Sequence, residues 1–246
     1  MYSRDLLKVT IVSLMMIVCF EAVASVVING TRLIYSGGER EVTVKLNNNG
    51  DSPALVQTWI DDGDPKSTPM LSKAPFIISP PVFRMDSKVI QNLRVIFTGK
   101  ELPQDKESIY WFNLLEIPAQ SNSTSVTTNM LQMAFRSRIK LFYRPKSLDG
   151  FSSSAPEQVK WRIVPRAKEF ILEAHNSSAF YITVTSLRLL EGGRSYSSEG
   201  EMIGPGMTHE FVLPSLKEEP GSEAKVEFNT LNDFGLDVIT TRQLSL

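Results

Sequence analysis

Beyond residue 24, the chain is a succession of short stretches in which apolar and polar residues alternate. Val42, Val44 and Leu46 alternate with polar residues, as expected for a strand with one buried and one solvated face. Similar stretches recur at intervals of roughly eight to twelve residues, and turn residues such as those at 47–50 separate them. No stretch has a convincing helical period. The pattern therefore predicts an all-β protein built from β-sandwiches.

The expected strands fall into two groups. A Gly-, Ser- and Pro-containing segment, Lys146–Pro156, separates them and is typical of a linker. We therefore expect a first domain over residues 25–146 and a second, smaller one over 147–246. In the first, Met130–Tyr143 is expected to be one long strand that ends at Pro145. The double proline after Ser79 predicts a sheet edge or a bend, with a cis peptide bond as an option.

The first 24 residues predict an export leader. Arg4 and Lys8 precede an apolar run, Val9–Phe20, and Ala22-Val23-Ala24 is a small-residue cleavage signal before Ser25. The run is short for a membrane span, although an uncleaved anchor is the alternative. The single cysteine, Cys19, lies inside this leader. The exported protein would then contain no cysteine and no disulfide.

The residue inventory argues against an enzyme. The chain has no G-x-S-x-G motif and no Gly-rich phosphate loop, and its two histidines have no metal-ligand spacing. Asp61, Asp62 and Asp64 lack the spacing and distal Glu of a helix–loop–helix calcium site, so we interpret them as a solvated turn. We expect no metal and no cofactor. A formal net charge of −1 also argues against a general nucleic-acid binder.

A local basic segment departs from this neutral average. No Asp or Glu occurs from Ile117 to Leu148, and five basic residues lie within that window: Arg136, Arg138, Lys140, Arg144 and Lys146. We interpret Arg136 and Arg138 as solvent-facing charges that protect an edge strand. Lys140 points away from the face of Ile139 and Leu141. In a cleft it would need an anion, either a distant acid of this chain or a group from outside.

A second pattern precedes the basic residues. Leu131, Met133 and Phe135 alternate with Gln132, Ala134 and Arg136. Ordinary core packing explains such a row. The alternative is a row of apolar side chains on an edge strand that can add to the sheet of another protein.

Four segments, taken together and in this order, resemble the periplasmic pilus (fimbrial) chaperones. They are ISPPVFRM at 78–85, LPQDKESIYWFNLLEIP at 102–118, IKLFYRP at 139–145 with LQMA shortly before it, and NDFG at 232–235. The resemblance implies two immunoglobulin-like β-sandwich domains in an L or boomerang arrangement. It implies a non-enzymatic periplasmic protein that binds pilus subunits, lends each one a strand, and delivers it to an outer-membrane usher.

The resemblance also implies roles for single residues. Arg32 and Lys140 match the cleft cations that anchor the C-terminal carboxylate of the subunit. The residues that would enter the subunit's groove are Leu131, Met133 and Phe135. The residues that match an inter-domain ionic network are Glu107, Arg144 and Asp233. The short loop Gln120–Asn129, without a cysteine pair, resembles the short-loop branch of the family.

Two other classes of protein remain as alternatives. One is a secreted immunoglobulin-like structural or adhesive surface protein, and the other is a secreted hydrolase, for which no residue can be nominated. An apolar edge strand is also a hazard in solution, so self-association through the 130–143 strand is a further hypothesis.

Overall fold

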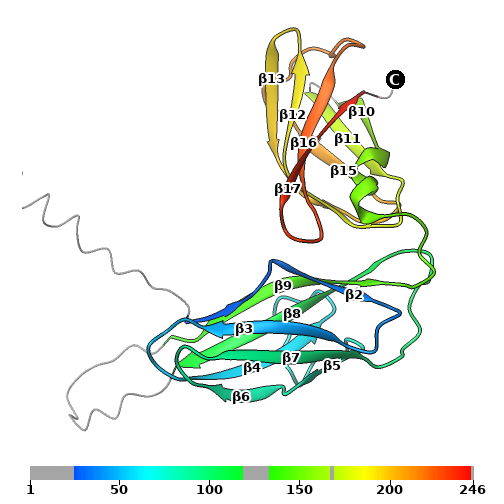
Figure 1. The fold of residues 1–246 in the computed structure, drawn as a ribbon. Helices are drawn as coiled ribbons and strands as arrows, with labels where there is room; N and C mark the ends of the chain where they lie inside the picture. The colour runs from blue at the N-terminus through cyan, green and yellow to red at the C-terminus, as the bar shows by residue number, and fades with distance from the viewer. Residues whose placement is uncertain (1–24, 119–132, 167–168, 245–246) are drawn as a thin grey trace, which may run out of the picture.

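The computed structural model describes residues 25–118, 133–166 and 169–244. It contains two β-sandwiches whose long axes cross steeply, so that the molecule is L-shaped (Figure 1). The first sandwich packs a sheet of order β1-β3-β7-β5 against a sheet of order β2-β9-β8-β4-β6. Its strands are β1 (Val26–Ile28), β2 (Arg32–Ser36), β3 (Val42–Asn48), β4 (Ala54–Asp61), β5 (Phe76–Ser79), β6 (Val82–Met85), β7 (Ile90–Phe97), β8 (Ser108–Pro118) and β9 (Phe135–Arg144).

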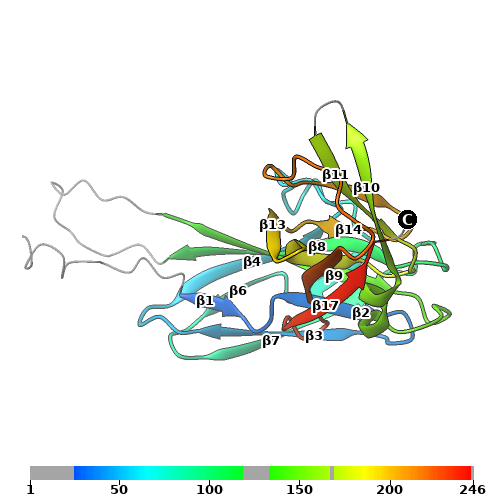
Figure 2. The ribbon, with the colours of Figure 1, turned by 90° about the horizontal axis from the view of Figure 1, so that it is seen from above.

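The second sandwich packs β10-β11-β15 against β13-β12-β16-β17, with β14 paired to β12. Its elements are η1 (Ser152–Gln158), β10 (Val159–Arg166), β11 (Glu169–Asn176), β12 (Ile182–Glu191), β13 (Arg194–Glu199), β14 (Met202–Ile203), β15 (Thr208–Val212), β16 (Lys225–Leu231) and β17 (Asp237–Gln243). Seen from above, β17 lies over β2 and β9 of the first sandwich (Figure 2).

Each sandwich has its own core, formed by the inward-facing residues of both its sheets. Tyr35, Phe112 and Leu141 are among the buried residues of the first core, and Trp161 and Phe228 are among those of the second. This separation agrees with the two groups of alternating stretches in the sequence, because a strand such as β3 buries the side chains of one face, among them Val44 and Leu46.

The N-terminal strand changes sheet at Gly30. β1 pairs with β3 in one sheet, whereas β2 pairs in parallel with β9 in the other. Gly30 adopts a φ of 122° between them, a conformation that favours glycine. Arg32 therefore does not lie on β1 but is the first residue of β2.

Three further expectations can be compared with the structure. β9 begins at Phe135 rather than at Met130, and residues 130–132 lie outside the described residues. The expected linker contains the 3₁₀ helix η1. The double proline joins two edge strands, β5 and β6, and the Ser79–Pro80 bond is cis. Within the described ranges, no helix is long and apolar enough to cross a membrane.

Candidate functional site

The candidate site lies on the outer face of the five-stranded sheet of the first sandwich. On β9, Leu141 and Tyr143 belong to the core, with Ile139 packed against it. The alternate residues project from the opposite face because successive side chains of a strand point to opposite sides. These alternate residues are Arg136, Arg138, Lys140, Phe142 and Arg144.

One row of this face crosses four strands. Asp61 on β4 pairs in register with Trp111 on β8, and Trp111 pairs with Lys140 on β9. Lys140 in turn pairs with Arg32 on β2. Because cross-strand partners lie side by side on one face, the sheet places these four side chains in a line, with the two cations adjacent at one end.

Arg32 is half-buried between the two sandwiches. Its Nη1 donates to the carbonyl oxygen of Leu231, at the end of β16, over 3.0 Å. Its Nε is buried and has no hydrogen-bond partner. Burial lowers the pKa of the Arg32 guanidinium, although the charges of Asp233 and Glu107 act in the opposite direction. The guanidinium thus keeps donor capacity that the described residues do not use.

The Lys140 side chain also has unused hydrogen-bonding capacity among the described residues. Among the described residues, no hydrogen bond or ion pair involves its ammonium group, whose Nζ lies 5.7 Å from the centre of the Trp111 ring. Burial and the neighbouring charge of Arg32 lower the pKa of Lys140, and Glu201 of the second sandwich acts in the opposite direction. Two partly dehydrated cations therefore stand side by side, an arrangement that favours binding of an anion.

Arg138 does not face solvent, contrary to our expectation. Its guanidinium donates to both carboxylate oxygens of Asp61, with Nη2–Oδ1 at 2.5 Å and Nε–Oδ2 at 3.2 Å. Its carbon Cζ lies 4.2 Å from the centre of the Trp111 ring. The side chain of Asp61 is fully buried, so the interpretation of Asp61 as part of a solvated turn is also wrong, although Asp62 and Asp64 are exposed.

Arg136 is exposed, as expected, but groups of the protein also bind its guanidinium. Its Nη2 donates to Asn113 Oδ1 over 2.7 Å and its Nη1 to the carbonyl oxygen of Pro65 over 2.7 Å. The guanidinium also lies over the Trp59 ring, 4.8 Å from its centre. The period-2 pattern of β4, which places Trp59 and Asp61 on one face, is the signal by which the sequence could have revealed these partners.

The structure brings Glu107, Arg144 and Asp233 into one ion-pair network between the sandwiches. Arg144 donates to Glu107 Oε1 over 2.8 Å and to the two oxygens of Asp233 over 2.9 and 3.1 Å. Glu107 also accepts the backbone N–H of Tyr181 over 2.7 Å, and Asp233 accepts the Ser152 hydroxyl over 2.9 Å. Residues of both sandwiches thus converge on a single guanidinium.

The pKa values of the two acids in this network shift in opposite directions. Burial raises the pKa of the Glu107 carboxyl, and Arg144 and the Tyr181 N–H offset only part of that effect. Burial also acts to raise the pKa of Asp233, but bonds from Arg144 and Ser152 outweigh it and lower the pKa overall. The bonds from Arg144 and Ser152 therefore stabilise the charged form of Asp233.

β9 has a free edge along the first half of its length. β8 pairs with residues 135–143 of β9, but β2 covers only residues 140–144 on the other side. Within the described part of the chain, the second edge of residues 135–139 has no partner strand. Met133 is exposed and Phe135 is partly exposed near this edge. Leu131 lies outside the described residues.

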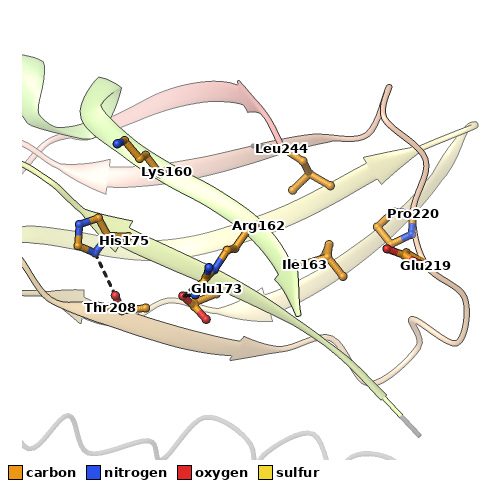
Figure 3. A pocket seen from close by; sticks show the side chains of 9 residues that line it. All are labelled: Lys160, Arg162, Ile163, Glu173, His175, Thr208, Glu219, Pro220 and Leu244. Atoms are coloured by element: carbon orange, nitrogen blue, oxygen red, sulfur yellow. Dashed lines mark hydrogen bonds and ion pairs between the residues drawn. The ribbon is translucent and has the colours of Figure 1, made fainter. Parts of the chain in front are cut away.

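A pocket of about 490 Å³ adjoins the site between the two sandwiches, and Arg32, Phe142, Leu231 and Phe234 are among the residues that line it. A second pocket, of about 620 Å³, lies within the second sandwich (Figure 3). Its His175 contacts the Thr208 hydroxyl at 3.0 Å, and its Arg162 pairs with Glu173 at 2.6 Å. The first pocket therefore borders the candidate site through Arg32, whereas Lys140 is not among the residues that line it.

Both halves of the chain match known protein families. Residues 25–149 match the family described as "Pili and flagellar-assembly chaperone, PapD N-terminal domain". Residues 154–241 match "Pili assembly chaperone PapD, C-terminal domain".

Individual relatives agree with these matches. The chain is 39% identical to the probable fimbrial chaperone YadV of Escherichia coli K12 over 87% of either chain. It is 38% identical to the chaperone protein HifB of Haemophilus influenzae over 96% of this chain and 95% of that one. The crystal structure of the YadV chaperone superposes with a TM-score of 0.76 at 37% identity, over 90% of this chain and all of that one. These matches exclude the alternatives of a surface adhesin and a hydrolase. The chain belongs to the PapD family of pilus-assembly chaperones and is a non-enzymatic, periplasmic fimbrial chaperone.

Proposed function

We propose that this chaperone binds the C-terminal carboxylate of a pilus subunit at Arg32 and Lys140. The observation that carries the proposal is that these two cations are register neighbours and that neither has an ion-pair partner among the described residues. A carboxylate between them would make charge-assisted hydrogen bonds, which are roughly twice as strong as neutral ones. It would also supply the acceptor that the buried Nε of Arg32 lacks.

The direction of the bound segment follows from the sheet. A strand added to the free edge of β9 at residues 135–139 lies in line with β2, which occupies the same edge from Arg32 onward. The added strand must therefore end where β2 begins. If that end is its C-terminus, the strand runs in the same direction as β2 and hence parallel to β9. Its terminal carboxylate then meets Arg32 and Lys140.

The row Leu131, Met133 and Phe135 would supply the apolar part of the contact. Each such side chain that enters a groove of the subunit contributes about 1.5–3 kcal/mol. A related chaperone has been solved together with a pilin. A solved complex of the Salmonella enterica SafA pilin with the SafB chaperone superposes with a TM-score of 0.73 at 25% identity. In that case the chaperone of the pair binds a pilin.

The network of Glu107, Arg144 and Asp233 holds the angle between the sandwiches and does not touch the subunit. The short Gln120–Asn129 loop in the sequence supports assignment of the chain to the short-loop branch of the family. The loaded chaperone delivers its subunit to an outer-membrane usher, and the empty one covers its free edge by self-association through β9, which concentration-dependent sedimentation would detect.

Co-purification from the periplasm tests the central proposal. The tagged chaperone is expressed together with its candidate subunits as wild type, Lys140→Ala and Lys146→Ala. Lys146 is a matched control because it lies in the same basic window but is exposed beyond the end of β9. We expect the wild type and Lys146→Ala to retain the subunit and Lys140→Ala to lose it. Equal retention by all three proteins would refute the role of Lys140.

A second pair of variants tests the strand edge. Phe135→Asp places a charge where the subunit groove would close, and Met70→Asp places one at an exposed methionine of the β4–β5 loop. Loss of the subunit with Phe135→Asp but not with Met70→Asp is expected. If the two variants behave alike, the subunit is held by a surface other than the edge of β9.

A further inference from the structure

Glu116, near the end of β8, is a buried acid that the proposed function does not use. Only 4% of its surface is exposed. Its Oε2 accepts the backbone N–H of Val26 over 3.0 Å. Its Oε1 accepts the backbone N–H of Ser25 over 3.3 Å and also the Ser25 hydroxyl. Three donors from two consecutive residues thus converge on one carboxyl group.

This carboxyl group has no cation beside it. Among the described residues, no Lys, Arg or His forms an ion pair with Glu116, in contrast to Asp61 and Glu107. Buried charges in proteins are normally paired, because removing an unpaired carboxylate from water is costly. A nitrogen atom that becomes charged would complete the site, and the Ser25 nitrogen already occupies the required position.

The surroundings hold Ser25 firmly in this position. Its carbonyl oxygen accepts the N–H of Asn49 over 2.7 Å. Gly50 packs so closely against it that a Cβ at that position would collide with the Ser25 side chain. Asn48 stabilises the turn that carries Gly50. It is only 1% exposed, and its Oδ1 accepts the Gly50 N–H over 3.0 Å.

The sequence predicts leader cleavage between Ala24 and Ser25. In that hydrolysis a leader peptidase adds water across the peptide bond, so Ala24 receives the hydroxyl and Ser25 the hydrogen. The new α-amino group has an ordinary pKa of about 7.7–8.0 and takes up a proton at neutral pH. We propose that Glu116 is the binding site for this α-ammonium group, and that leader removal creates a partly buried ion pair between the two.

The pair would join the two sheets of the first sandwich. Ser25 leads into β1 of the β1-β3-β7-β5 sheet, whereas Glu116 belongs to β8 of the other. Glu116 is also the register partner of Phe135, the first residue of β9. Cleavage therefore fastens the N-terminal strand beside the point where β9 begins. The uncleaved chain lacks the charge and folds less stably, which suits a chain that must cross a membrane unfolded.

Mass spectrometry of the protein purified from the periplasm gives the first test, and we expect a chain that begins at Ser25. A chain that begins at any other residue would overturn the proposal.

Thermal unfolding of four proteins gives the second test. They begin either at Ser25 or at an added Ala before Ser25, each with Glu116 or with Glu116→Gln. With Glu116, the extra residue should lower Tm by about 5 °C, the size expected for loss of a partly buried ion pair in a two-domain chain. With Glu116→Gln it should change Tm by less than about 1 °C. An equal fall in both backgrounds would show a steric effect and refute the ion pair.

A third measurement does not depend on the folding of Glu116→Gln. Acetylation of the α-amino group near neutral pH requires an accessible, unprotonated amine. The wild-type amine that begins at Ser25 should react at least about tenfold more slowly than the amine of the Ala-extended protein, which a pair worth about 1.4 kcal/mol or more would give. Equal acetylation rates in the two proteins would mean that Glu116 does not bind the α-ammonium group of Ser25.

Discussion

Asp61 binds Arg138 through both carboxylate oxygens, and this leaves Lys140, two positions further along β9, as a cation without a carboxylate among the described residues. Groups of this chain therefore bind most of the cations in the basic window of the sequence. Asp61 holds Arg138, and Glu107 and Asp233 hold Arg144. Lys140 and the adjacent Arg32 are left for an anion from outside.

Replacement of Lys140 by methionine should separate binding from stability. Burial and the charge of Arg32 lower the pKa of Lys140, so at neutral pH the charged ammonium opposes folding. We expect Lys140→Met to have a Tm no lower than that of the wild type and yet to lose the subunit. A marked fall in Tm would mean that Lys140 has a stabilising partner within the protein and is not an unpaired cation available to a ligand.

The same shift predicts a pH dependence at the alkaline end. The unfolded chain binds the Lys140 proton more tightly than the folded one. The free energy of unfolding of the wild type should therefore rise, relative to Lys140→Met, as the pH increases from the folded-state pKa to the ordinary lysine pKa of 10.5. Denaturant unfolding of both proteins over this range measures the difference, and a difference that does not change with pH would contradict the shift.

Asp61→Asn should destabilise the protein by about 2–4 kcal/mol at pH 7, because it leaves the guanidinium of Arg138 unpaired on a largely buried face. Burial acts to raise the pKa of Asp61, but bonds from Arg138, Asn113 and Gly63 outweigh it and lower the pKa overall. The advantage of the wild type is therefore complete above the ordinary aspartate pKa of 3.8 and is lost as the pH falls through the lower folded-state pKa.

Asp62→Asn is the matched control for this substitution, since Asp62 is the exposed neighbour of Asp61. Its effect should stay within about 0.5 kcal/mol at any pH. Denaturant unfolding at pH 7 and pH 3 compares the three proteins. An Asp61→Asn protein whose deficit is equally large at both values would show that the ionised carboxylate is not the source of the stability.

Arg144→Ala should loosen the connection between the sandwiches. It leaves the buried Glu107 and the half-buried Asp233 facing each other without a cation, a change that costs about 3–5 kcal/mol for a buried pair. We expect a lower Tm, a larger radius of gyration in small-angle scattering and faster proteolysis within residues 145–151. Arg162→Ala, which breaks an exposed pair with Glu173, should cost less than about 1 kcal/mol and change none of the three.

The sequence predicts the architecture but does not reveal that Asp61 binds Arg138, and the reason is physical. Alternation is a local property, so it reveals the strands and the outward direction of Lys140. Asp61 and Arg138 are 77 positions apart, and only the pairing of β4, β8 and β9 brings them together. The sheet change at Gly30 is likewise a backbone conformation that alternation does not record. The Arg32–Lys140 neighbourhood was expected from resemblance to a family rather than from any spacing.

Gly235→Ala tests how closely the second sandwich approaches the strand that carries Arg32. Gly235 has a φ of 77°, and a Cβ there would collide with the hydroxyl oxygen of Thr31, the neighbour of Arg32. The left-handed conformation alone costs about 1–2 kcal/mol for alanine. Gly206→Ala isolates that cost, because Gly206 has a φ of 69° and a Cβ there meets nothing within 4 Å.

We expect Gly235→Ala to lower the free energy of unfolding by more than Gly206→Ala does, because it adds the collision with Thr31 to the same backbone strain. Thr31→Ala in the Gly235→Ala background removes the colliding oxygen and should recover only the difference between the two glycine variants. Denaturant unfolding of the four proteins measures both terms. Equal losses at the two glycines, with no recovery from Thr31→Ala, would mean that the loop around Asp233 moves away freely and that the approach at Thr31 does not fix the angle of the cleft.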